Sequence, residues 1–295
     1  MARTVHPSEN ELGSFHIPGS DMRQALILGE QGGYNLDLDP QFAPGAPDGS
    51  LIARDINTIF DLHGFEEPRM PYVVGEADFS QVLIGTKYNS VPLKFPGSEY
   101  RVPKELACIR YILELCASHE QGLNPRVDEF YAYLSLQRSE VIQGQRQNSG
   151  GLHSDGLQGR RIQPKVMIEH GYSATDRDPT LFFPQVYDMD GVDIDTHWMD
   201  DVFAGQTDRE KRISFAAGQV TVFDAYCVHQ AVPATSTGPR TFFKLTFANR
   251  QYDRAGNTIN LLFADEYLRE SWAFGPRSMP LDLICADGSA VGDIR

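Results

Sequence analysis

The chain has 295 residues, of which 41% are hydrophobic, enough for a sizeable core, so a disordered protein is not expected. Forty acidic residues against 26 basic ones give a formal net charge of −14. Because nucleic-acid binding needs a basic surface, this balance argues against a nucleic-acid partner. No run of 18 apolar residues and no apolar signal region at the N-terminus is found, so we expect no membrane partner and a cytoplasmic location. These properties favour a small-molecule substrate and do not predict an oligomeric state.

Residues 1–125 are expected to form an N-terminal arm followed by buttressing helices. The first 50 residues are rich in Gly, Pro, Asp and Ser, which is typical of irregular structure. Apolar residues at helical spacing predict one helix over 51–64 and a second over 103–118, and short strands are expected at 71–74 and 81–84. The residues that define the two helices are Ile52, Ile56, Ile59 and Phe60 in the first, and Leu106, Ile109, Leu113 and Cys116 in the second.

Residues 126–250 alternate between short β-rich segments and turns rich in Gly and Pro. This pattern favours a mostly β domain of the jelly-roll or barrel type, with the helices flanking it. An acidic insertion over 188–212 is expected to be a solvated, mobile cover with few apolar contacts, and residues 251–295 are expected to form a C-terminal extension. We predict that all 295 residues belong to a single domain.

Two separated histidines and one aspartate form a candidate metal site. His153 and Asp155 stand at positions i and i+2, so on an extended strand both side chains project from the same face. His229 follows the predicted strand 218–224 and is the preferred third ligand, with His197 in the insertion as an alternative. Two imidazoles and one carboxylate on one face of an octahedron are typical of non-haem Fe(II) oxygenases. His170 is a further candidate, on the expectation that it faces the interior of the domain.

Arg240 opens the predicted strand 240–247, eleven residues after His229. At the start of a strand an arginine is often a solvated end residue. The alternative is that its planar guanidinium binds a carboxylate through two parallel hydrogen bonds.

The ordered set of His153, Asp155, His229 and Arg240 resembles the Fe(II)/2-oxoglutarate-dependent dioxygenase superfamily. The resemblance covers roughly residues 130–247 and implies a double-stranded β-helix, the jelly-roll or cupin-like barrel of that superfamily. It also implies that Fe(II) binds the two histidines and the aspartate, that 2-oxoglutarate and O2 are co-substrates, and that Arg240 holds the far carboxylate of 2-oxoglutarate. Weaker candidates for hydroxyl contacts to 2-oxoglutarate are Thr180, Tyr131 and Tyr133. If Arg240 is not the anchor, Lys165 and Arg138 are the next candidates.

The resemblance implies an enzyme that oxidises a C–H bond of a small polar metabolite, such as an amino acid or a natural-product intermediate, and releases succinate and CO2. Hydroxylation is the default outcome. Two alternatives stay open at this point. One is a cupin-like metal-binding protein that is not an oxygenase, and the other is an interaction domain without a metal.

Overall fold

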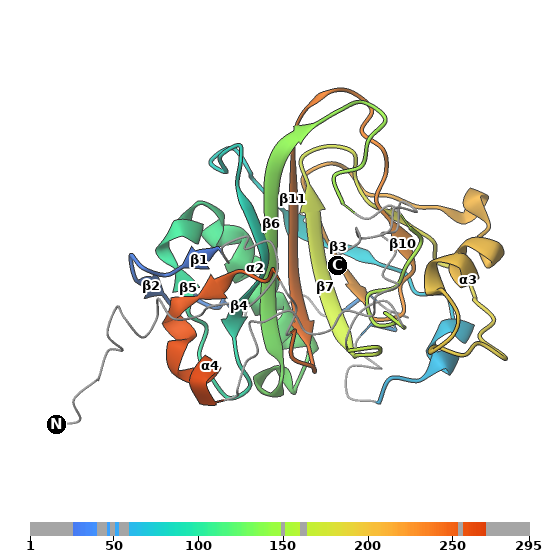
Figure 1. Cartoon of the computed structure of the whole chain (residues 1–295), viewed down its shortest axis with the longest axis horizontal. Helices are drawn as coiled ribbons and strands as arrows, with labels where there is room; N and C mark the ends of the chain where they lie inside the picture. The colour runs from blue at the N-terminus through green and yellow to red at the C-terminus, as the bar shows by residue number, and fades with distance from the viewer. Residues whose placement is uncertain are drawn as a thin grey trace, which may run out of the picture.

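A six-stranded antiparallel sheet forms the centre of the protein (Figure 1). The computed structural model describes residues 26–39, 46–47, 51–52, 59–148, 151–159, 164–252 and 256–269. In spatial order the strands of this major sheet are β3 (Tyr72–Glu76), β9 (Gln219–Asp224), β7 (Glu169–Thr175), β11 (Gly238–Ala248), β6 (Tyr131–Val141) and β4 (Lys87–Lys94). The longest pairing joins β11 to β6 over eleven residue pairs, from Gly238 opposite Val141 to Ala248 opposite Tyr131.

Short segments pair into a second layer, the minor sheet. β8 (Leu181–Phe182) is antiparallel to β10 (His229–Gln230), and single bridges add His153 beside His229 and Ile213 beside Phe182. Phe223 of the major sheet contacts the ring of His229 at 4.9 Å and that of Phe182 at 5.4 Å between centroids, so the two sheets face each other. From β6 to β11 the chain alternates from one sheet to the other. β6, β7, β9 and β11 belong to the major sheet, and the segments that connect them contribute to the minor sheet.

The two faces of the major sheet differ in polarity because side chains alternate along each strand. On the outer face of β11, Phe243, Leu245 and Phe247 are fully buried. Helix α2 (Arg110–Leu123) lies against this outer face, where Glu120 of the helix binds His170 of β7. The opposite face, which looks toward the minor sheet, carries polar side chains instead, among them Ser173, Thr175, Thr221, Arg240 and Lys244.

The remaining elements surround these layers. β1 (Ile27–Leu28) pairs in parallel with β12 (Ile259–Asn260), and β2 (Gly33–Tyr34) pairs with β5 (Val102–Pro103). Within the described residues, the other helices are α3 (Met199–Gln206), α4 (Ala264–Arg269) and the 3-10 turns η2 (Leu62–Glu66), η3 (Lys104–Ile109), η4 (Val127–Glu129), η5 (Arg209–Lys211) and η6 (Leu261–Phe263). Among the described residues, no helix combines the length and the apolar character needed to cross a bilayer.

The structure corrects several predicted boundaries in the N-terminal part. The helix expected over 103–118 becomes regular α-helix only at Arg110, because Pro103 belongs to β5 and a 3-10 turn follows it. Its predicted apolar stripe is nevertheless buried. The strand expected over 81–84 is a pair of turns, closed by hydrogen bonds from Val82 N to Phe79 O and from Thr86 N to Leu83 O, and the strand comes later, as β4.

The helix predicted over 51–64 is not found in its described part. Residues 53–58, including Ile56, lie outside the described residues. Ile59 is 89% exposed, which is incompatible with a place on a buried helical face, and the 3-10 turn η2 begins at Leu62. β3 and β4 also show that residues 1–125 contribute strands to the major sheet as well as helices.

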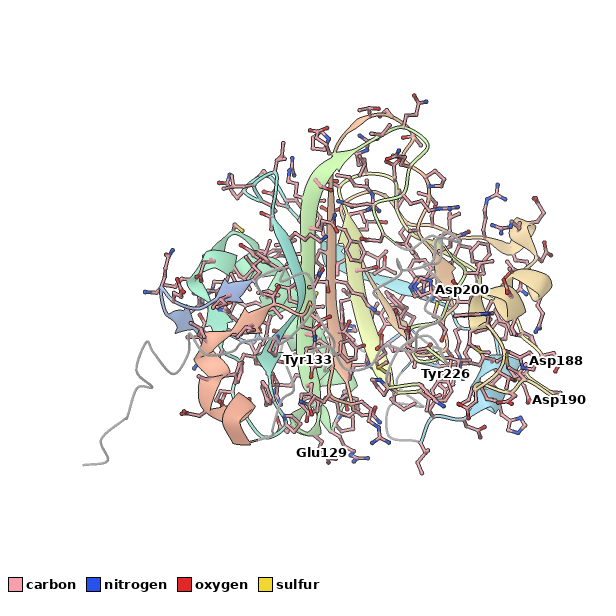
Figure 2. All side chains as sticks on the ribbon, in the orientation of Figure 1. Glu129, Tyr133, Asp188, Asp190, Asp200 and Tyr226 are labelled. Carbon is pink, nitrogen blue, oxygen red and sulfur yellow. The ribbon has the colours of Figure 1, made fainter. Side chains whose placement is uncertain are left out.

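The acidic insertion is packed more firmly than its composition predicts. Its residues Asp188 and Asp190 lie at the outer margin of the molecule, on the side of α3 (Figure 2). However, α3 places Met199 and Phe203 four residues apart on one helical face, and both are buried. The ring of Phe203 contacts Phe65 at 5.3 Å and Tyr187 at 5.2 Å. The expectation of few apolar contacts is therefore wrong for α3, while a role of the insertion as a cover stays a prediction.

Candidate metal centre

His153 and Asp155 are presented by a tight turn at the edge of the minor sheet. His153 N donates to His229 O and His229 N donates to His153 O, so the two histidine backbones are tied together. His153 and Ser154 form isolated β-bridges, and Asp155 lies in the turn that follows them, which differs from the extended strand that we predicted. Gly156 makes this turn possible, because a Cβ atom there would lie 2.5 Å from Ala225 Cβ and 2.6 Å from Ala225 O.

The structure brings the three predicted ligands together. One donor atom from each of His153, Asp155 and His229 lies within 4.8 Å of the others. His229 Nε2 is 3.4 Å from Asp155 Oδ2, and His153 Nε2 is 4.0 Å from Asp155 Oδ1. The two imidazole centroids are 4.4 Å apart. Among the described residues these three form the one group of His, Cys, Asp or Glu side chains that is close enough to hold a metal ion.

Backbone carbonyls orient both imidazoles. His153 Nδ1 donates to Gly151 O at 2.9 Å, and His229 Nδ1 donates to Cys227 O at 3.0 Å. A neutral imidazole that donates from Nδ1 has its lone pair on Nε2, the atom that both histidines direct toward Asp155. Such hydrogen bonds are the usual means of fixing metal-binding histidines. The donor set therefore fits a divalent transition metal.

The electrostatics of the site keep Asp155 and His229 in their metal-binding protonation states. Burial alone would raise the pKa of Asp155, but the charges of Lys244, His229 and His153 outweigh it and hold this pKa well below its ordinary value. Burial lowers the pKa of His229 to about 4, although the charge of Asp155 opposes the change. Asp155 is therefore an anion and His229 a neutral ligand at physiological pH.

Lys244 is a residue of this site that the sequence did not lead us to expect. Its Nζ lies 2.6 Å from Asp155 Oδ2 and 3.4 Å from Glu169 Oε1. Burial lowers the pKa of Lys244, but the two carboxylates more than compensate and the pKa is raised. The signal was present, since Lys244 is four residues after Arg240 on a strand and must share its face.

Arg240 is buried at the start of β11, on the same face as Lys244. Its Nε donates to Arg177 O at 3.1 Å, its Nη2 to Asp178 O at 2.9 Å and its Nη1 to Gln147 Oε1 at 2.5 Å. Because a guanidinium has five N–H groups, these three bonds fix the fork and leave two donors for a ligand. Arg240 is thus a positioned interior cation and not a solvated strand end.

A small cavity between the two sheets is lined mainly by hydroxyl and amide side chains and by two phenylalanines. Its lining includes Ser173, Thr175, Thr180, Thr221, Gln219 and Phe182. Thr175 is 4% exposed, and its Oγ1 finds no hydrogen-bond partner in the part of the chain that the structure describes. Thr180 comes two residues after Asp178, whose carbonyl binds Arg240. A buried hydroxyl without a partner indicates a place where a polar ligand atom would be stabilised.

The structure places the two predicted tyrosines away from Arg240. Tyr133 stands opposite Thr246, six residues along β11 from Arg240, a span of about 20 Å in extended strand. The rings of Tyr131 and Tyr133 stack at 5.7 Å, and Tyr133 stacks on Tyr252 at 4.5 Å, in a second apolar cluster. The structure therefore does not bring the tyrosines together with Thr180 and Arg240 around one carboxylate.

The other candidate residues lie outside the site. His170 is on the outer face of β7, where it binds Glu120, so it does not face the interior. His197 is exposed, and its Nδ1 accepts a hydrogen bond from Asp193 N. Lys165 pairs with Asp195 at the surface, and Arg138 stands opposite Thr241 on the outer face of the sheet. Neither of these two cations shares the face of Arg240.

No family model matches the chain, and no curated protein matches it in sequence. Among solved structures, EvdO2 from Micromonospora carbonacea var. aurantiaca in complex with 2-oxoglutarate is 16% identical with a TM-score of 0.35, and the match covers 65% of this chain and 91% of that one. The Kdo hydroxylase KdoO, a non-haem Fe(II) alpha-ketoglutarate-dependent dioxygenase in complex with cobalt(II), is 13% identical with a TM-score of 0.37, over 72% of this chain and 88% of that one. A second EvdO2 structure, 18% identical with a TM-score of 0.31, matches 49% of this chain and is covered over 62% of its own length, less than two thirds.

One of these neighbours, KdoO, is described as an Fe(II)- and alpha-ketoglutarate-dependent dioxygenase, and one EvdO2 structure holds 2-oxoglutarate. Their identities and TM-scores are too low to assign a function to this chain. The proposal below rests on the site residues.

Proposed function

We propose that this protein is an Fe(II)- and 2-oxoglutarate-dependent oxygenase that oxidises a C–H bond of a small polar metabolite. The observation that carries the proposal is the cluster of His153, Asp155 and His229, in which both imidazoles present Nε2 to one carboxylate. Two imidazoles and one carboxylate with open positions opposite them suit non-haem Fe(II). When bound, Fe(II) and 2-oxoglutarate would activate dioxygen for the oxidation, with release of succinate and CO2.

We further propose that the fold is a double-stranded β-helix. The passage of successive segments between the major and minor sheets supports this, because a chain that alternates between two facing sheets winds as a flattened helix. The order of the minor sheet supports this fold as well: His153 lies beside β10, β10 pairs with β8, and β8 lies beside Ile213. In such a fold, the interior between the sheets is the natural place for a ligand.

The interior residues have distinct roles in this proposal. Arg240 would bind the far carboxylate of 2-oxoglutarate with the two donors that its protein partners leave, and Thr180 and Thr175 would offer hydroxyl groups nearby. Phe182 and Phe223 pack beside His229 and exclude water from one side of the metal ligands. The substrate is proposed to be small and polar because the net charge of −14 argues against a nucleic-acid polymer.

The test adds Fe(II) and then 2-oxoglutarate to the purified protein without oxygen and follows the visible charge-transfer band of the complex. Oxygen and a panel of small metabolites are then supplied, and succinate is quantified. We expect the band with the unmodified protein and its loss in His229→Ala. A protein that binds metal but gives neither the band nor succinate would instead be a cupin-like metal-binding protein. A protein that binds no metal would contradict the proposal altogether.

A further inference from the structure

Lys244 places an ammonium group between the buried carboxylate of Glu169 and the partly buried carboxylate of Asp155, on the interior side of the major sheet. Its Nζ is 2.6 Å from Asp155 Oδ2, 3.4 Å from Glu169 Oε1 and 5.6 Å from the centroid of the Phe223 ring. Lysine is rarely buried, because removing an ammonium group from water is costly unless opposite charges compensate. Here the compensation comes from two carboxylates, and one of them is the candidate metal ligand.

The two oxygens of Asp155 have different surroundings. Oδ2 accepts the hydrogen bond from Lys244. His229 Nε2 is 3.4 Å from the same oxygen, but His229 already donates from Nδ1 to Cys227 O, so as a neutral ring it has no proton to offer there. Oδ1 lies on the side of His153, 4.0 Å from its Nε2. Lys244 is therefore the group that satisfies Oδ2.

Glu169 and Tyr252 hold Lys244 from its other side. Glu169 is 1% exposed, accepts from Lys244 with Oε1 and accepts from the Tyr252 hydroxyl with Oε2. The Tyr252 ring stacks on Tyr133 at 4.5 Å with an interplanar angle of 3°. These contacts restrict the conformation of the Lys244 side chain and hold its ammonium group in hydrogen-bond contact with Asp155.

We propose that Lys244 is a positioning residue that reserves Oδ2 of Asp155 for itself, so that the carboxylate offers a single oxygen to a divalent metal. This inference rests on the proposed function and concerns the number of positions left open. Two imidazoles and one carboxylate oxygen leave three positions of an octahedron, two for a chelating keto acid and one for a diatomic molecule. If Asp155 bound through both oxygens, the position for the diatomic molecule would be taken.

Replacing Lys244 by methionine removes both the donor and the positive charge. Oδ2 of the partly buried Asp155 would then lose the donor that satisfies it, and the metal would be the nearest cation to take its place. We expect Lys244→Met to bind Fe(II) or Co(II) at least about tenfold more tightly, because a second oxygen is gained and a repelling charge is lost. We also expect nitric oxide, a stand-in for dioxygen, to bind the anaerobic Fe(II)–2-oxoglutarate protein at least about tenfold more weakly.

The experiment uses the full chain. Metal affinity is measured by competition with a chelator, and nitric oxide binding by the electron paramagnetic resonance signal of the iron–nitrosyl adduct. Lys244→Arg keeps the charge and the donors and should behave like the unmodified protein. Glu169→Gln is the matched control, since it disturbs the same network but leaves Lys244 on Asp155, and nitric oxide binding should persist.

Because Lys244→Met removes the ammonium group that contacts Asp155 and Glu169, it is purified with metal present, and Lys244→Gln serves as a second variant. The glutamine amide can still donate to Oδ2 but carries no charge. Metal binding should therefore tighten because the repelling charge is lost, while nitric oxide binding is retained because Oδ2 still has its donor. Unchanged metal and nitric oxide affinities in Lys244→Met, with only a lower melting temperature, would overturn the inference. Failure of the unmodified protein to bind metal would contradict the proposed function instead, so the two failures are distinguishable.

Discussion

Arg240→Ala tests whether the buried guanidinium selects 2-oxoglutarate. The side chain makes three hydrogen bonds to its own chain, to Arg177 O, Asp178 O and Gln147 Oε1, and this leaves two N–H groups for a carboxylate. Hydrogen bonds to a charged group contribute about 1.5–3 kcal/mol. With tenfold in affinity for every 1.4 kcal/mol, the loss corresponds to an increase of about 10- to 150-fold in the dissociation constant of 2-oxoglutarate.

The assay titrates 2-oxoglutarate into the anaerobic Fe(II) protein and follows the charge-transfer band, while metal affinity is measured separately. Metal affinity should stay nearly unchanged, because Arg240 touches none of the three ligands. The 2-oxoglutarate affinity of Arg240→Lys should lie between those of the unmodified protein and of Arg240→Ala, since lysine keeps the charge but loses the two parallel N–H donors of the guanidinium. Arg177→Ala is the matched control: it removes a neighbouring arginine whose side chain binds Asp178 and Ser236, while its carbonyl remains for Arg240. A normal 2-oxoglutarate affinity in Arg240→Ala would refute the assigned anchor.

Three further outcomes are expected. His229→Ala should abolish Co(II) uptake while His197→Ala keeps it, and the reverse result would show that the third ligand is misassigned. Glu120→Ala breaks the buried pair with His170 and should lower the free energy of unfolding by about 3–5 kcal/mol in urea titrations, so a change within error would show that the pair is not needed. Burial lowers the pKa of His119 from 6.5 to about 4. Between about pH 6.5 and pH 4, this histidine is therefore protonated in the unfolded chain but neutral in the folded one. Its contribution to stability is therefore lost as the pH falls through this window, and His119→Gln should lose less stability than the unmodified protein between pH 7 and pH 5; equal losses would contradict this reasoning.

Periodicity predicted those parts of the fold that are decided by local pattern. The strands predicted at 71–74, 218–224 and 240–247 are present as β3, β9 and β11, because β-branched and aromatic residues bounded by turn residues are a local signal of a strand. It failed where a local hydrogen bond closed a turn, as at Leu83, whose carbonyl accepts from Thr86 N. It also failed for the insertion, where Phe203 finds an apolar partner in Phe65, far away in the sequence.

The sequence also leaves open which face of the sheet each strand residue occupies. His170 and Glu169 are neighbours on β7, and the sequence does not say which of them looks inward. Pairing with β11 decides it, since Glu169 then shares the interior side with Lys244 and His170 turns toward Glu120 on α2. A shift of one residue in that pairing would exchange the two roles.

By itself the sequence determined which residues are the candidate metal ligands and their order, His153, Asp155 and His229, with Arg240 beyond them. Residue type and spacing are enough for that, because the chemistry of imidazole, carboxylate and guanidinium groups does not depend on the fold. Only the tertiary structure decided what surrounds the ligands. Lys244 is 89 residues from Asp155 in the chain, and their ammonium and carboxylate groups meet only because β11 lies in the major sheet, facing the turn that holds Asp155. A contact between two separate layers of the fold depends on how the layers pack, and no pattern within a single strand contains that information.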